Sequence, residues 1–525
     1  MFELTPNVFR IASAILPPRR LAAFARLARS LGILLLCLAP TPAFGDVGVL
    51  LNESLDTSFA RISGTGHSAV YFSNICADSP IKLRLCRPGE LGSVMSNYTT
   101  LGEDQPYEWN VVPLSIYLYG VEDPQNRPLF GSRKIKHVLE ERYRDKFLSA
   151  LCTSKSCRTS NGAEWREMVG ATLERSMYTF VVATSVEQDR ALVAEFNSLP
   201  NINHFNGITH NCAEFVRRVL NTYFPHSARA DYLNDFGLIT PKAIARSFSR
   251  YAEHHPEVQF HVLHFAQLPS TIKRSSECRN ADEQLFHSKK LLVPMLIFAN
   301  HELPFMVASY LLTARFNPQH ELEKHPSAET ADLEQEIREA KSQNDVYRVN
   351  QLKAVFKKKR AHVVGTKKEW KEYREEFAAI ADNAINREVI PNDKFLGRLF
   401  NYLDRNGAPS VDADGAVWLE LSEGGKPARI GISAGNLFAP GTDSQWAYAL
   451  VLARAGHYLK SPKHSREAMP EFKNDWALLQ AARRNSLATI EAKSTSGSPS
   501  PTSSDASRSQ IPAPADCIVG QSCEY

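Results

Sequence analysis

The sequence predicts a mixed α+β fold, in which an antiparallel sheet packs on a helix that begins with a cysteine. A mainly helical region and a small mixed C-terminal segment follow. Up to about residue 270, runs of β-branched and aromatic residues alternate with stretches of helical spacing, and beyond it helical spacing prevails. In addition, 43% of the 525 residues are hydrophobic and 22% are charged. This is a globular composition, with length for two or three domains.

The elements of the first domain follow from local patterns. Side chains alternate over 68–72, and we expect residues 81–85 to pair with this strand as a hairpin that a Cys76–Cys86 disulfide closes. Further strands are expected at 111–119 and 178–183, and helices at 133–151, at 186–199 and from Cys212 to the residue before Pro225.

Composition divides the chain into five parts. They are a leader over 1–45, a sheet-and-helix domain over 46–270, a helical region over 271–390, a small mixed α/β segment over 391–490 and a Ser/Pro-rich tail over 491–525 that we expect to be disordered. The charged residues 319–386 indicate a solvated helical hairpin or stalk that turns near Gly365. Two apolar runs within 291–313 favour a buried helical pair, with a membrane-proximal hairpin as the alternative.

Residues 1–45 have the pattern of a long secretory signal. Arginines precede a short apolar run over 31–39, and Ala43-Phe44-Gly45 offers small residues for cleavage. We expect export to the periplasm or the extracellular space, and an uncleaved membrane anchor is the alternative. Five arginines and one glutamate give this segment a charge of +4, equal to that of the whole chain. The remainder is therefore near neutral, and we expect no nucleic-acid partner.

The cysteine spacing fits an oxidising compartment. Eight cysteines follow Cys37, and three close pairs suggest local disulfides: Cys76–Cys86, Cys152–Cys157 and Cys517–Cys523. Cys212 and Cys278 are left over. Cys212 is therefore either a free thiol or half of a structural Cys212–Cys278 disulfide, which would exclude a nucleophilic role.

His67 and Cys212 form the pair that indicates chemistry most directly. His67 follows a glycine and enters a strand, whereas Cys212 opens a helix that Asn211 caps. A helix N-terminus stabilises a thiolate, and an imidazole beside it can exchange the proton. With Asn211 as the cap, we expect the N–H groups of residues 212–214 to stabilise a thiolate or an oxyanion. The alternative is a pair of core residues in an inactive fold.

The segments around both residues resemble the circularly permuted branch of the papain-like superfamily. Residues 205–215 resemble the aromatic and N-C-x-x-F signature of lecithin–retinol acyltransferase-like and PPPDE-type proteins, and residues 66–72 resemble the Gly-His strand of that branch, which is related to NlpC-type enzymes. The closest setting is the Lnb-type N-terminal periplasmic domain. The resemblance covers roughly residues 55–225, and it implies a permuted papain-like fold with Cys212 as nucleophile and His67 as general base.

The resemblance also implies a third polar residue that orients the histidine. Asn74 and Glu90 are the candidates near the strand of His67, whereas Arg84 would be a poor orienter because a guanidinium cannot accept a hydrogen bond. His210, next to the cap, is either a second base or an exposed side chain.

These observations predict an exported cysteine-dependent hydrolase or acyltransferase that acts on an amide, thioester or ester carbonyl. The substrates that the resemblance implies are cell-wall peptides or acyl lipids, and no cofactor is expected. The apolar segment 291–313 slightly favours a membrane-proximal substrate. The alternative is a non-catalytic envelope protein that uses a papain-like scaffold for assembly.

Other motifs give weaker signals, and we expect no metal site. Residues 404–407 and 412–415 resemble fragments of a calcium loop but lack its distal glutamate, which favours turns. His301-Glu302 lacks the second histidine of a zinc-protease helix. Solvated or packed side chains are the favoured interpretation of four clustered histidines: His254, His255, His261 and His264.

Overall fold

A computed structural model describes residues 44–495 with internal gaps. The gaps are 56–63, 99–106, 152–163, 203–204, 207–208, 232–233, 236, 288–303, 305–306, 309, 312–315, 424–425 and 461–468. Most of the predicted leader, of the predicted tail and of the segment 291–313 therefore lies outside the described residues, as do two of the predicted disulfides. The last two residues of the leader already belong to a strand (Phe44–Asn52), and the first five of the tail belong to a helix that ends at Thr495. Residues 45–525 group as one compact unit, apart from residues 1–44.

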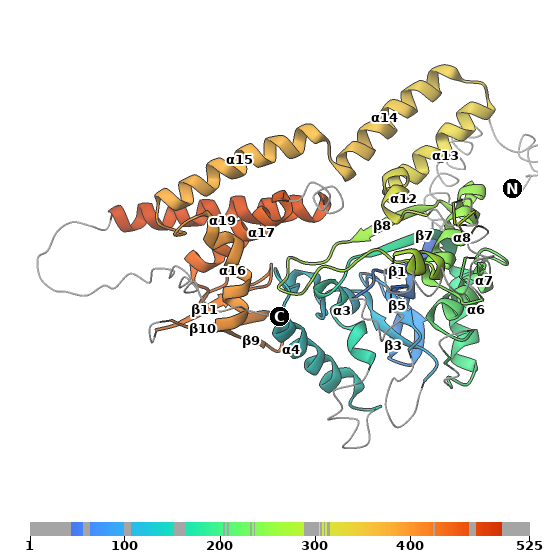
Figure 1. The fold of residues 1–525 in the computed structure, drawn as a ribbon, viewed down its shortest axis with the longest axis horizontal. Helices are drawn as coiled ribbons and strands as arrows, with labels where there is room; N and C mark the ends of the chain where they lie inside the picture. The colour runs from blue at the N-terminus through green and yellow to red at the C-terminus, as the bar shows by residue number, and fades with distance from the viewer. Residues whose placement is uncertain are drawn as a thin grey trace, which may run out of the picture. The chain divides into compact units, whose positions relative to one another are not determined.

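A six-stranded antiparallel sheet with the order β6-β5-β2-β1-β7-β8 forms the centre of the first domain (Figure 1). Its strands, in chain order, are β1 (Phe44–Asn52), β2 (His67–Phe72), β5 (Ser93–Ser96), β6 (Asn110–Pro113), β7 (Met177–Ser185) and β8 (His261–Phe265). The protein is thus of mixed α+β class, as the sequence predicts.

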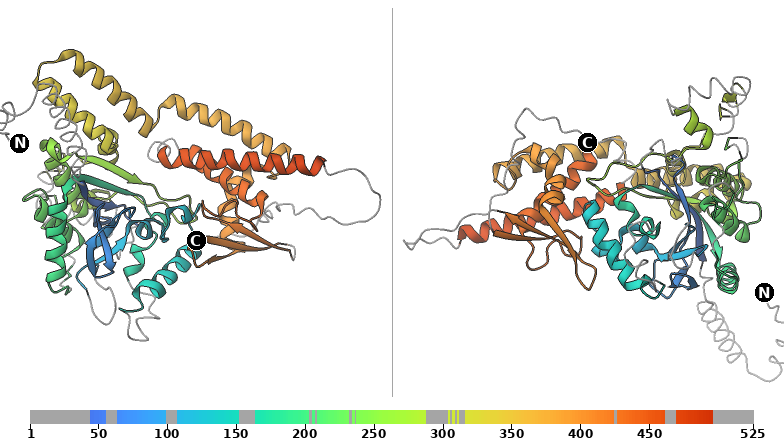
Figure 2. Two further views of the ribbon diagram at one scale, coloured as in Figure 1. Left: turned by 180° about the vertical axis from the view of Figure 1, so that it is seen from behind. Right: turned by 60° about the horizontal axis from the view of Figure 1, so that its bottom comes forward.

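The two faces of this sheet carry different layers. Three helices, α6 (Val186–Ser198), α7 (Cys212–Tyr223) and α8 (Pro241–His254), cover one face, and they appear in green on one side of the blue strands (Figure 1, Figure 2). The other face packs on α3 (Leu114–Tyr119) and on the 3₁₀ turns η3 (Glu164–Met168) and η4 (Ala171–Leu173). Val70 and Phe72 pack with the helices, whereas Ala69 and Tyr71 pack with the turns, as strand alternation requires.

The predicted Cys76–Cys86 disulfide is confirmed, but the hairpin that it closes differs from the expected one. It links β3 (Ile75–Ser79) to the residue after β4 (Lys82–Leu85), with an S–S length of 2.01 Å, and these two strands pair with each other. The expected pairing of 81–85 with 68–72 is wrong, because β1 and β5 already occupy both edges of β2.

The predicted strand over 111–119 ends early. The strand β6 stops at Pro113, which has no N–H to donate and caps α3 with φ of −52°. The helix α3 then ends at Gly120 in the left-handed region, with φ of 78°. The proline therefore turns a continuous apolar run into a strand followed by a helix.

Helices with strong local caps form where the sequence predicts them. The helix α4 (Arg133–Tyr143), capped by Ser132, continues into the π turn η2 (Arg144–Leu148). The helix α6 has a complete capping box, in which Ser185 and Gln188 bond to each other's backbone N–H. No described helix is long and apolar enough to cross a membrane.

The charged region does form helices, but its turn lies elsewhere and it is not solvated throughout. Its helices are α12 (Pro318–Lys324), α13 (Ala328–Ser342), α14 (Val346–Val364) and α15 (Lys367–Asn386). The hairpin turn between α13 and α14 lies at 343–345, whereas Gly365 separates α14 from α15. Trp370 and Ile380 of α15 are buried in the C-terminal core, because they face the helices that follow.

The C-terminal part combines helices with a small sheet. It contains α16 (Asp393–Asn406), the antiparallel strands β9 (Gly407–Val411), β10 (Val417–Glu423) and β11 (Lys426–Gly431), and the helices α17 (Ser444–Lys460) and α19 (Met469–Thr495). Its core also includes Leu129 and Phe130 from the first domain. The remaining short helices are η1 (Pro124–Asn126), η5 (Pro256–Val258) and α9 (Ala281–His287).

Candidate active site

Cys212 is the first residue of α7, and the preceding residue caps this helix. The Oδ1 atom of Asn211 accepts from the backbone N–H groups of Ala213 (3.0 Å) and Glu214 (3.1 Å). Its Nδ2 atom donates to the carbonyl oxygen of Ile239 at 2.9 Å, which ties the cap to the segment before α8. The predicted cap is confirmed, but it already uses two of the three N–H groups that we expected to stabilise an oxyanion. Only the N–H of Cys212 remains outside the cap.

The Cys212 side chain is a half-buried free thiol that lies beside the start of β2. The expected alternative, a disulfide with Cys278, is not formed, since both thiols are free. Burial raises the pKa of the Cys212 thiol, although the N–H groups of Ser68 and Ala213 favour the thiolate. The nearby Glu167 carboxylate raises this pKa further. The thiol is therefore protonated near neutral pH.

His67 begins β2 directly after a glycine that no other residue can replace without strain. Gly66 has φ of 72°. A Cβ atom at Gly66 would lie 2.4 Å from both the carbonyl oxygen of Asn52 and the Sγ atom of Cys278. Cys278 donates its S–H to that same carbonyl oxygen at 2.9 Å. Asn52 is also the partner of His67 across β1 and β2. This close approach fixes the position at which His67 enters the sheet.

The His67 ring is buried against an aromatic side chain. It stacks on Tyr98, with ring centroids 4.3 Å apart and planes inclined by 20°. Burial lowers the pKa of His67 to about 3, with Glu167 opposing this shift and Arg175 adding to it. The imidazole is therefore neutral near pH 7. Its Nε2 atom is buried without a hydrogen-bond partner, so within the described residues it is available for a proton.

The structure brings Cys212 and His67 to the same end of β2. The thiol lies against Ser68, the residue that follows His67, and the Glu167 carboxylate acts on the pKa of both groups. Alternation places Ser68 on the α7 face and His67 on the face of Tyr98. Because Nε2 of His67 has no partner in the described part of the chain, it forms no hydrogen bond to the thiol. The resting pair is thus neutral and not yet bonded.

A polar cluster that sequence reasoning missed surrounds the His67 ring. Asn52 donates its Nδ2 to the Tyr117 hydroxyl at 2.8 Å. Arg175 is buried and forms an ion pair of 2.7 Å with Glu167. Burial alone would raise the pKa of Glu167, but Arg175 and His67 bring it below its usual value. These residues come from β1, α3, η3 and the segment before β7, and no spacing in the sequence links them.

Some buried polar atoms of this cluster have no hydrogen-bond partner among the described residues. In the part of the chain that the structure describes, they include Oδ1 of Asn52, Nε2 of His67 and Nε of Arg175. A buried polar atom without a partner is costly, and proteins retain few of them.

The two predicted orienting residues do not lie at this site. Asn74 follows the opposite end of β2, roughly 20 Å from His67 at the usual rise of a strand, and donates to Asp189 at 2.8 Å. Glu90 binds Arg84 through two hydrogen bonds of 2.6 and 2.7 Å. The prediction for both residues is wrong. Residues near the strand β2 in sequence need not lie near its first residue, His67. The ring of His67 instead stacks on Tyr98, and the Glu167 carboxylate acts on its pKa.

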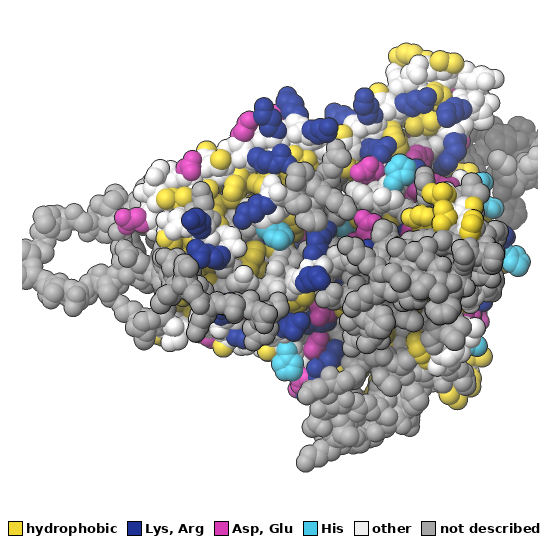
Figure 3. Space-filling model, in the orientation of Figure 1, with side chains coloured by type: hydrophobic (Ala, Val, Ile, Leu, Met, Phe, Trp, Pro, Cys, Tyr) yellow, Lys and Arg dark blue, Asp and Glu magenta, His cyan; other side chains and the backbone are white. Residues whose placement is uncertain are grey.

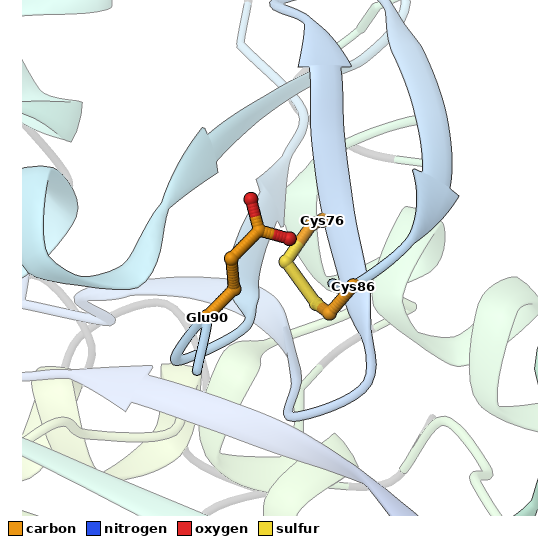
Figure 4. A group of neighbouring side chains, drawn as sticks. All are labelled: Cys76, Cys86 and Glu90. Atoms are coloured by element: carbon orange, nitrogen blue, oxygen red, sulfur yellow. A yellow bond between two sulfur atoms is a disulfide. The ribbon is translucent and has the colours of Figure 1, made fainter. Parts of the chain in front are cut away.

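Two groups of metal-ligand side chains occur in the described residues, and neither fits a metal. In the first, Glu90 approaches Cys76 and Cys86, whose sulfur atoms are joined in the disulfide (Figure 4). In the second, Glu253, Glu321 and His325 converge, but cationic side chains already neutralise it. Lys324 binds both glutamates, and the carboxylates of Glu253 and Glu334 raise the pKa of His325 to about 9 despite its burial.

The clustered histidines do not converge on one point. The ring nitrogens of His254, His255 and His261 approach the carbonyl oxygen of Arg250, the Glu257 carboxylate and the carbonyl oxygen of Gln259, respectively. His264 packs on the Tyr178 ring. His210 is exposed and contacts Asn206 and Thr209. The segment 412–415 forms a tight turn, in which the Asp412 carboxylate accepts from the N–H of Ala416 at 2.8 Å.

Comparisons of the chain with protein-family models, with curated proteins and with solved structures found no match.

Proposed function

We propose that this protein is an exported cysteine-dependent hydrolase or acyltransferase built on a permuted papain-like scaffold. Cys212 is the nucleophile and His67 is the general base. The observation that carries the proposal is the position of a free thiol, at a capped helix N-terminus, beside the end of β2 where a buried imidazole has an unpartnered Nε2 atom.

The neutral resting pair defines how the nucleophile is activated. A thiol whose pKa is raised and an imidazole whose pKa is lowered do not form a thiolate–imidazolium ion pair at rest. The proton passes from Sγ to Nε2 of His67 as the sulfur attacks the substrate carbonyl, as in serine hydrolases. The Glu167 carboxylate stabilises the imidazolium that forms. Because His67 and the thiol face opposite sides of β2 in this structure, this transfer requires the His67 ring to turn past the end of the strand when substrate binds, the stage at which catalytic hydrogen bonds often tighten.

The reaction proceeds through a thioester. The Sγ–C bond forms, the carbonyl becomes an oxyanion, and the N–H of Cys212 donates to it. The intermediate collapses, the bond to the leaving amine, alcohol or thiol breaks, and the leaving group takes the proton from His67. Water or an acyl acceptor then attacks the thioester, which releases Cys212. An acyl acceptor makes the protein an acyltransferase, and water makes it a hydrolase.

A non-catalytic envelope protein is the second candidate. It is favoured by the same buried and neutral pair, because stacking on Tyr98 also suits a histidine that only packs. In that case the cluster around His67 holds a polar ligand without reacting with it.

Acylation by a generic donor distinguishes the two candidates. The protein is incubated with p-nitrophenyl acetate at pH 8, and intact mass spectrometry with peptide mapping locates the acetyl group. We expect one acetyl group on Cys212, none on the Cys212→Ala variant, and release of the group when the donor is removed. If Cys212 gains no acetyl group faster than free cysteine does at the same pH, the enzymatic proposal is wrong.

A further inference from the structure

The helix α14 carries charges of one sign only, whereas the neighbouring helices α13 and α15 carry both signs. Between Val346 and Val364 it carries no acidic residue and six basic ones: Arg348, Lys353, Lys357, Lys358, Lys359 and Arg360. In contrast, the adjacent helix α13 has five acidic and two basic residues. A net charge of +6 on one helix creates a positive potential at the protein surface, which attracts anionic partners.

Most of this charge is exposed and unpaired. In Figure 3, basic side chains follow the edge that α14 and α15 form in the orientation of Figure 1. Among the described residues, Lys359 is the only basic side chain of α14 with an ion pair, 2.9 Å from Glu329. On α15, Lys368 and Lys371 face glutamates one turn away, at 3.8 and 3.6 Å. Most of the positive charge of α14 is therefore available to an anionic partner.

Exposed apolar side chains begin the helix α14, ahead of most of its cations. Val346 and Tyr347 expose 71% and 75% of their surface, directly after the turn between α13 and α14. Val355, two turns further, exposes 44%. Exposed aliphatic and aromatic groups at the start of a cationic helix suit an interface that is anionic at its surface and apolar beneath.

We propose that α14 docks on a membrane surface rich in anionic phospholipids. Lysine and arginine side chains contact the headgroup phosphates, and Val346 and Tyr347 enter the boundary between headgroups and acyl chains. An acidic polymer such as nucleic acid would satisfy the lysines alone, and it would leave the exposed apolar tip without a role. The tip is the observation that favours a lipid surface. The proposal does not depend on the chemistry of Cys212.

Matched charge reversals test the electrostatic part. The full chain is mixed with vesicles of phosphatidylcholine alone or with 30% phosphatidylglycerol, a composition chosen as roughly that of an anionic membrane, and sedimented. We expect binding only to the anionic vesicles. The double variant Lys353→Glu/Lys357→Glu should bind at least roughly tenfold more weakly. The control Lys368→Glu/Lys371→Glu changes the net charge equally on α15 and should bind nearly as the wild type does.

The apolar tip has its own pair of variants. Val346→Ser/Tyr347→Ser should weaken vesicle binding roughly three- to tenfold, whereas Phe438→Ser, at another exposed apolar residue, should not. Hydrogen exchange in the presence of vesicles should slow in residues 344–358 and not in 368–376, which localises the contact even if other segments also bind lipid.

Two results would overturn the proposal. One is equal binding by the two charge-reversal variants together with unchanged exchange in residues 344–358. The other is a protein that binds single-stranded DNA but no vesicles, when DNA binding depends on Lys353 and Lys357 and not on Val346 and Tyr347. This result would show that α14 binds polyanions in general.

Discussion

Buried polar groups lie near both ends of β2, but those near one end are fully hydrogen-bonded and one at the other end is not. At the far end, the buried Asp189 accepts from Asn74 (2.8 Å), Thr184 (3.0 Å) and Tyr223 (3.0 Å), so its carboxylate is fully satisfied. At the near end, Nε2 of His67 has no partner among the described residues, although His67 is also buried.

Under the proposed function, this difference separates a structural network at the far end from a reactive group at the near end. A satisfied buried network rigidifies a fold, and changing one member leaves the others unpaired. A buried base that is neutral and unpartnered instead costs stability, and proteins keep such groups where chemistry or binding needs them. Substitutions at the far end should therefore affect folding first, and substitutions at the near end should affect reactivity first.

The largest effect is expected at the near end. Replacing His67 with glutamine removes the base but keeps a planar polar side chain. Acetylation of Cys212 at pH 8 should slow by roughly 10²- to 10⁴-fold, the usual contribution of a general base, with little change in the free energy of unfolding. Stopped-flow release of p-nitrophenol measures the rate. Equal rates in the variant and the wild type would show that the imidazole takes no proton from the thiol.

The far end should respond in the opposite sense. The Asp189→Ala substitution leaves three donors without an acceptor and should lower the free energy of unfolding by about 3 kcal/mol. Acetylation of the molecules that remain folded should be unchanged. Urea denaturation measures the first effect, with Glu195→Ala, an exposed position on the same helix, as the control. A stable Asp189→Ala variant with impaired acetylation would reverse the assignment of the two ends.

Local interactions explain what the sequence could predict. The cap by Asn211 depends on N–H groups two and three residues ahead, and the Cys76–Cys86 bridge spans a single hairpin. Both are readable because their partners are close in the chain. For the same reason, the helix that places Cys212 was predicted correctly.

Long-range register explains what could not be predicted. The Arg175–Glu167 pair reaches His67 from about 100 residues away, through a 3₁₀ turn and a loop that have no periodicity. The sequence predicts Asn74 as an orienting residue because it lies near the strand of His67, yet this strand carries it to the opposite end, where it binds Asp189. The pairing of β1, β2 and β5 decides these neighbours, and only tertiary packing fixes it.

The pH dependence of stability should reveal the buried neutral imidazole. Because burial lowers the pKa of His67 to about 3, the unfolded chain binds a proton below pH 6.5 that the folded chain does not. Folding therefore loses stability as the pH falls from 6.5 toward 3, by about 2.5 kcal/mol at pH 4.5 relative to pH 7. The His67→Gln variant should lack this loss. The test compares wild type and variant by urea denaturation at pH 7 and pH 4.5. Equal pH dependence in both proteins would mean that the His67 ring is solvated.

The smallest and most discriminating effect is expected at Glu167. This carboxylate raises the pKa of the Cys212 thiol and also favours a proton on His67, so its two influences act in opposite directions on reactivity. In Glu167→Gln, alkylation of Cys212 by iodoacetamide at pH 8 should become a few times faster, because more thiolate is present. Acetylation should become several times slower, because the imidazolium loses its stabilising charge.

Glu167→Asp keeps the charge and serves as the control, and it should move both rates less. A variant in which both rates rise together would assign Glu167 to thiol burial alone. One in which both fall together would indicate that Arg175, left without its partner, has disturbed the packing around the ring. Only a divergence of the two rates supports Glu167 as the residue that positions charge beside the base, the role for which proximity in sequence had suggested Asn74 and Glu90.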